Sequence, residues 1–114
     1  MSNNRIETIN PTTGRVISSY ESMSIDKIEL ITNNAQNAFE KWRKKEILER
    51  CDYIRDLAKI LRRNKDRYAR IVTEEMGKPI TQSIAEIDKC ALVCEYYSEN
   101  AEAFLRDEII PTEF

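Results

Sequence analysis

Apolar residues recur every three or four positions between residues 24 and 105, which is the spacing of one face of an α-helix. A charged stretch at 43–45 and two single residues, Asn64 and Gly77, interrupt this pattern, so the sequence predicts four helices. The last of them starts after Pro79, continues to the end of the range and would be roughly 40 Å long. The apolar positions of the four predicted helices are, in order, Ile28, Ile31, Ala35, Ala38, Phe39 and Trp42; Ile47, Cys51, Ile54, Ala58 and Leu61; Tyr68, Ile71 and Val72; and Ile80, Ile84, Ile87, Ala91, Cys94, Tyr97, Ala101 and Phe104.

Residues 5–20 follow a different pattern, in which polar and apolar side chains alternate on either side of a short loop. Alternation with a period of two is typical of a β-strand. Pro11 and Gly14 in the loop favour a tight turn, because proline presets φ and glycine accepts a positive φ. The sequence therefore predicts a mainly α fold with an N-terminal β-hairpin at 5–20, a helical segment at 24–105 and an extended tail at 106–114.

The predicted helix ends carry residues suited to those positions. Ser24 precedes the first helix and Asn64 the third, and both are typical N-cap residues. Gly77 can take the left-handed conformation that ends a helix, and Pro79 can begin the next one because its missing N–H would have no partner there. The segment 75–79 is therefore predicted to be a sharp junction between the last two helices.

Length and charge narrow the classes of function. The chain has 114 residues, enough for one domain with a modest core. With 18 basic and 20 acidic residues, no overall charge attracts nucleic acid or an anionic membrane, and no apolar run is long enough to span a bilayer. Three cysteines and no apolar N-terminal leader indicate reduced thiols and a cytoplasmic location. The chain has no histidine, which removes the commonest general base and the commonest metal ligand.

The residues that could carry chemistry have ordinary structural interpretations. A zinc site needs four ligands, and beside Cys90 and Cys94 the sequence offers neither histidine nor a second cysteine pair, so we predict no metal site. Both thiols are predicted to be small buried side chains. Lys78 lacks the glycine spacing of a phosphate-binding loop. The basic clusters 41–45 and 62–70 leave nucleic-acid binding as a weak alternative, since solvated helix ends explain cations there.

Three segments in this order resemble the N-terminal region of the aldehyde dehydrogenase superfamily. They are NPTTG at 10–14, EMGKP at 75–79, and AEIDKCA at 85–91 followed by CEYY at 94–97 and NA at 100–101. The third segment is most similar to bacterial and archaeal succinate-semialdehyde dehydrogenases, which oxidise the semialdehyde to succinate with NAD or NADP. The resemblance spans residues 5 to 110, nearly the whole chain.

This resemblance implies that the chain is an incomplete part of an α/β dehydrogenase, from its cofactor-binding domain. In the family, the nucleophilic cysteine, the general-base glutamate, the oxyanion asparagine and the segment near the nicotinamide all follow this stretch. The resemblance thus implies no catalytic residue, no cofactor-binding residue and no activity for this chain alone. The complete enzyme would use NAD or NADP and form a homo-oligomer, and the remainder of the dehydrogenase chain would be this segment's partner.

The resemblance also implies that the last helix lies along the channel through which the aldehyde reaches the nucleophile. Glu86, Lys89 and Val93 share one face of this helix by their spacing. We expect these three residues to line the substrate tunnel, where Lys89 would offer a positive charge to a substrate with a distant carboxylate. The alternative is a surface lysine that pairs with Asp88 or Glu86.

A function from a different class also fits the pattern. A free-standing helical interaction module would use an exposed apolar stripe to bind a partner protein. The sequence offers no means of choosing NAD over NADP, because the residues that read the ribose 2′ position are not present.

Overall fold

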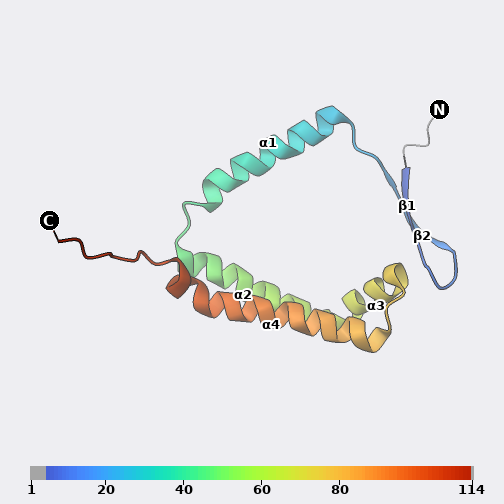
Figure 1. Ribbon diagram of the computed structural model, residues 1–114. Helices are drawn as coiled ribbons and strands as arrows, with labels where there is room; N and C mark the ends of the chain where they lie inside the picture. The colour runs from blue at the N-terminus through green and yellow to red at the C-terminus, as the bar shows by residue number, and fades with distance from the viewer. Residues whose placement is uncertain (1–4, 114) are drawn as a thin grey trace.

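The computed structural model describes residues 5–113, which form a two-stranded hairpin followed by four helices (Figure 1). The elements are β1 (Arg5–Ile9), β2 (Val16–Glu21), α1 (Ile25–Trp42), α2 (Ile47–Arg63), α3 (Lys65–Met76) and α4 (Ile80–Leu105). This order confirms the predicted mainly α fold. Residues 107–113 have no regular secondary structure, and position 114 of the predicted tail lies outside the described residues.

The hairpin is antiparallel, and one residue, Asn10, accepts several of the hydrogen bonds that close its loop. The side-chain Oδ1 of Asn10 accepts from the backbone N–H groups of Thr12 at 2.9 Å and Thr13 at 3.2 Å. Its carbonyl oxygen accepts from the N–H of Gly14 at 2.8 Å. Gly14 has a φ of 70°, the left-handed conformation that the sequence predicts for it.

Helix α1 extends from the hairpin to α2 as a separate arm (Figure 1). Ser24 caps it as predicted, since its Oγ accepts from the N–H of Lys27 at 3.3 Å. No residue of α1 is buried, and Ile28 remains 50% exposed on the predicted apolar side. At the C-terminal end the Trp42 ring lies 5.3 Å from that of Tyr53, centroid to centroid. This contact holds the end of the arm against α2.

The core lies along α4, which contacts α3 near its N-terminal end and then runs antiparallel beside α2 (Figure 1). Small side chains dominate it, so the helices approach closely. Between α3 and α4 the hydroxyls of Thr73 and Ser83 form a part-buried hydrogen bond of 2.9 Å. The buried residues among those described are Cys51, Ala58, Ala69, Ser83, Ile87, Ala91 and Ser98.

Two predictions about α2–α4 are wrong in detail. Asn64 makes no side-chain cap to α3, because its Nδ2 donates instead to the carbonyl of Ile60 at 2.9 Å, at the end of the preceding helix. Cys90 is exposed and Cys94 only partly buried. Cys90 lies about 100° around the helix from the buried Ala91, and therefore turns away from α2.

Gly77 brings the hairpin loop and the α3–α4 junction together. It has a φ of 69°, and its N–H donates to the carbonyl of Thr73 at 2.9 Å, so it ends α3 as predicted. A β-carbon added at Gly77 would lie 2.9 Å from Cγ of Pro11. Two of the segments that carry the family resemblance therefore meet in space.

The molecule is far from spherical. Its radius of gyration is 20.3 Å and its principal extents are 68 × 41 × 26 Å, whereas a compact domain of this length has a radius of gyration of about 13 Å. Within residues 5–113 no helix combines the length and apolar character needed to cross a bilayer. The arm and the hairpin account for the elongated outline in Figure 1.

Candidate functional site

The candidate site lies on the side of α4 that turns away from α2. Buried positions such as Ile87 and Ala91 define the covered side of this helix. The three predicted site residues, Glu86, Lys89 and Val93, lie on the uncovered side and line an open hollow of about 360 Å³ together with Cys90. The structure thus brings the three residues together, and their role in a tunnel stays a prediction.

Both acids near this hollow form ion pairs with lysines other than Lys89. Lys78, in the linker before α4, donates to the Glu86 carboxylate. Asp88 forms an ion pair with Lys65 of α3, with 3.1 Å between Nζ of Lys65 and Oδ2 of Asp88. Among residues 5–113, Lys89 makes no ion pair, although it is exposed beside both acids. Neither ion pair of the alternative interpretation, Lys89 with Asp88 or Lys89 with Glu86, is present among the described residues.

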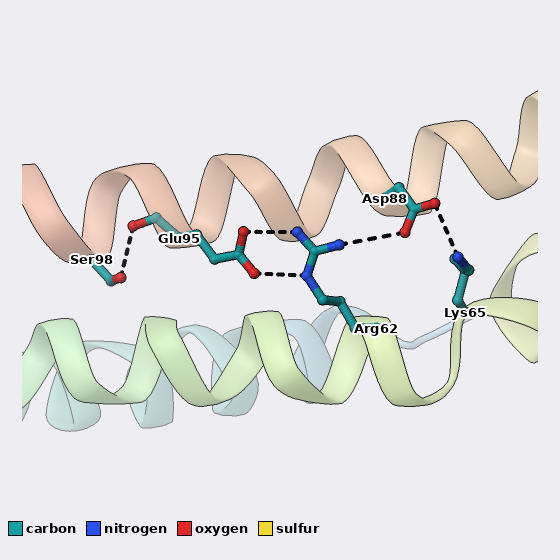
Figure 2. Close-up of polar contacts among 5 residues, drawn as sticks. All are labelled: Arg62, Lys65, Asp88, Glu95 and Ser98. Atoms are coloured by element: carbon teal, nitrogen blue, oxygen red, sulfur yellow. Dashed lines mark hydrogen bonds and ion pairs between the residues drawn. The ribbon is translucent and has the colours of Figure 1, made fainter.

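A polar network connects α2 to α4 (Figure 2). The Arg62 guanidinium donates through Nε and Nη2 to the two carboxylate oxygens of Glu95, each at 2.7 Å. Its Nη1 lies 3.6 Å from Oδ1 of Asp88. Ser98 Oγ donates to the carbonyl of Glu95 at 2.8 Å. Arg62 therefore bridges two acids that lie two turns apart on α4.

The ion pair between Arg62 and Glu95 shifts the pKa of both side chains. The hydrogen bond from Arg62, helped by the attraction of its charge, holds the pKa of the Glu95 carboxyl below its usual value. The carboxylate of Glu95 in turn raises the pKa of the Arg62 guanidinium, so both groups are charged at neutral pH.

A second hollow continues the site along α4. Leu92, Val93, Tyr96 and Tyr97 line about 410 Å³ of open and mainly apolar surface, and Val93 belongs to both hollows. The lining residues that were not predicted from the sequence are Cys90, Leu92, Tyr96 and Tyr97. The signal was present, because Cys90, Val93 and Tyr97 follow Glu86 at steps of four, seven and eleven, which lie on one side of a helix.

The described residues contain no glycine-rich phosphate-binding turn. The chain has two glycines, and they occupy separate turns, so no glycine-rich loop leads into a helix N-terminus where a pyrophosphate would bind. Within residues 5–113 no three side chains of the His, Cys, Asp or Glu type cluster as metal ligands would.

Comparison with known proteins gives a consistent result. The family model described as "Aldehyde dehydrogenase family" matches residues 1–113. A probable succinate-semialdehyde dehydrogenase (NADP+) of Synechocystis sp. is 39% identical over 108 residues, which are 95% of this chain and 24% of that protein. The succinate semialdehyde dehydrogenase Sad of Escherichia coli is 39% identical over 101 residues, 89% of this chain and 22% of that protein.

A solved structure agrees with these relatives. The crystal structure of succinic semialdehyde dehydrogenase from Streptococcus pyogenes, in complex with NADP+, superposes with a TM-score of 0.88 at 34% sequence identity. The match covers 94% of this chain and 24% of that one. The chain therefore spans about a quarter of the length of the relatives that it matches.

Proposed function

This chain belongs to the aldehyde dehydrogenase family, and from that premise we propose that it is the N-terminal part of an NAD(P)-dependent succinate-semialdehyde dehydrogenase. The observation that carries the proposal is the family match over residues 1–113, in a chain that spans about a quarter of its relatives. The complete protein would oxidise succinate semialdehyde to succinate in the cytoplasm, as a homo-oligomer.

Within that enzyme the chain supplies scaffold and one wall of the substrate tunnel. The catalytic and cofactor-binding residues lie in the remainder of the protein, so this chain by itself is inactive. The nicotinamide cofactor, when bound by the complete enzyme, accepts the hydride from the substrate. We assign no part of that step to residues 5–113, whose two glycines occupy separate turns.

The outward side of α4 gives this wall its chemistry. Lys89 meets the carboxylate at the far end of the semialdehyde, which is supported by its exposure and by the pairing of both neighbouring acids with other cations. Val93 and the apolar surface beyond it contact the methylene carbons of the substrate. Together they orient the aldehyde end toward a nucleophile supplied by the rest of the enzyme.

A chimera tests the proposal. This chain replaces the matching quarter of the Synechocystis relative, and reduction of NADP+ is followed with succinate semialdehyde as substrate. We expect the chimera to oxidise the semialdehyde, whereas the purified chain alone gives no NADH or NADPH with either cofactor. Turnover by the chain alone would overturn the assignment of the reactive groups to the remainder of the protein.

A further inference from the structure

Glu86 has two lysines within reach, and the choice between them decides the charge of the candidate site. Lys89 follows Glu86 by three positions on α4, a spacing at which helical side chains pair. Lys78 lies before the helix begins. In the structure the Glu86 carboxylate accepts a hydrogen bond from Lys78, and Lys89 lines the hollow without pairing with Glu86.

The backbone explains why Lys78 is placed to do this. Gly77 on one side is fixed in the left-handed conformation, and Pro79 on the other has a φ of −54°. Pro11 packs against Gly77 and restricts the linker further. The side chain of Lys78 is 35% exposed, compared with 47% for Glu86. Lys78 therefore loses less conformational freedom on pairing than a fully solvated lysine would.

We propose that Lys78 is a specificity-determining residue, which holds Glu86 and so keeps Lys89 free to bind a substrate carboxylate. This inference rests on the proposed function. Without Lys78, Glu86 either pairs with Lys89 or leaves its own negative charge uncompensated in the hollow. Both outcomes weaken the binding of an anionic aldehyde, and neither affects an uncharged one.

The test compares two aldehydes in the chimera. Lys78→Met is expected to raise KM for succinate semialdehyde about two- to fivefold, the range that one solvent-accessible ion pair supplies. The value of kcat, and KM for pentanal, an uncharged aldehyde of similar length, are expected to stay unchanged. Lys78→Arg keeps the positive charge and retains the original KM.

A second substitution separates charge from structure. Lys78→Met combined with Glu86→Gln is expected to restore KM for succinate semialdehyde, because glutamine carries no charge that could pair with Lys89. Lys59→Met is the matched control, since it removes an exposed ion pair to Asp56 within α2 and involves neither acid beside Lys89. That control is expected to leave KM for both aldehydes unchanged.

The outcomes distinguish this inference from the function on which it rests. A selective effect of Lys89→Met, together with equal effects of Lys78→Met on both aldehydes, would show that Lys78 is merely structural and would overturn the inference alone. Equal effects of Lys89→Met on both aldehydes would overturn the proposed role of Lys89, and the inference with it. If Lys78→Met prevents folding of the chimera, the same comparison with Lys78→Gln decides between these results.

Discussion

At the scale of single residues, the proposed function depends on the charge balance around Lys89. The neighbouring acids, Glu86 and Asp88, are bound by Lys78 and Lys65. Lys89 makes no ion pair among residues 5–113 and lies beside a mainly apolar hollow, which is our reason for proposing an anionic ligand with a short hydrocarbon chain. Succinate semialdehyde fits this description.

The first prediction concerns Lys89 itself. In the chimera, Lys89→Met is expected to raise KM for succinate semialdehyde roughly ten- to hundredfold, the loss of one charge-assisted contact, with little change for pentanal. Steady-state kinetics with both aldehydes provides the measurement. Lys59→Met, which alters an exposed lysine of α2, serves as the control.

A second residue-scale prediction follows from the Arg62–Glu95 pair. The pKa of Glu95 is lowered in the folded chain, so the pair adds stability above the ordinary glutamate pKa of about 4.3 and loses it as the pH falls through the lowered value. Glu95→Gln is therefore expected to melt below the unaltered chain at pH 7, and the gap should close as the pH approaches 3.

Circular dichroism at 222 nm across this pH range measures both melting temperatures. Glu99→Gln alters an exposed carboxylate of the same helix that makes no ion pair within residues 5–113, so its melting difference should not depend on pH in this way. A gap for Glu95→Gln that stays constant from pH 7 to pH 3 would contradict the assignment.

At the scale of the elements, the two glycines form a matched pair. Gly14 and Gly77 have φ values of 70° and 69°, yet nothing lies within 4 Å of a β-carbon at Gly14, while Pro11 lies 2.9 Å away at Gly77. Any difference between alanine substitutions at the two sites therefore reports the contact between the hairpin loop and the α3–α4 junction.

We expect Gly14→Ala to cost about 1–2 kcal/mol for the left-handed backbone. Gly77→Ala should cost about 1–3 kcal/mol more because of crowding against Pro11. Pro11→Ala removes Cγ and leaves Cβ at 3.8 Å, so it should recover most of the extra cost. Urea unfolding followed by circular dichroism measures these differences. Equal costs at the two glycines would show that the hairpin loop does not rest on the junction in solution.

Helix α1 shows how an element can satisfy every local rule and still lack a partner. It has a capping serine and an apolar side, yet no residue of its 18 is buried. In proteins, most of the stability of such a helix comes from the packing of its apolar side and not from intrinsic helix propensity. Its stability therefore depends on whatever covers its apolar side, which in the proposed function is the remainder of the dehydrogenase.

At the scale of the whole molecule, the elongated shape leaves much apolar surface in water. Large apolar side chains are exposed on both the arm and α4, including Ile25 at 74%, Leu92 at 59% and Phe104 at 58%. Monomeric proteins rarely leave contiguous apolar patches of this kind without a partner. This favours part of a larger enzyme over a free-standing module.

The corresponding prediction separates the two functions. The purified chain is expected to bind a hydrophobic dye such as ANS strongly at neutral pH and to associate as its concentration rises, whereas the chimera should do neither. Fluorescence titration and sedimentation velocity make the measurements. A chain that stays monomeric and binds no dye would favour the interaction module instead.

The sequence alone determined the elements and the residues that share a side of α4. The order of hairpin and four helices, the Ser24 cap and the Gly77 stop follow from spacing and turn chemistry. The common side of Glu86, Lys89 and Val93 follows from helical periodicity. These features depend on a few neighbouring residues and on backbone geometry, which a sequence states directly.

Only the tertiary structure decided which partners those residues have. The pairing of Arg62 with Glu95, the pairing of Lys78 with Glu86 and the contact of Pro11 with Gly77 join residues from different elements. The exposure of Cys90, which the sequence analysis predicted to be buried, was decided in the same way. Such contacts depend on how helices rotate and approach one another in space, and many arrangements satisfy the same local pattern.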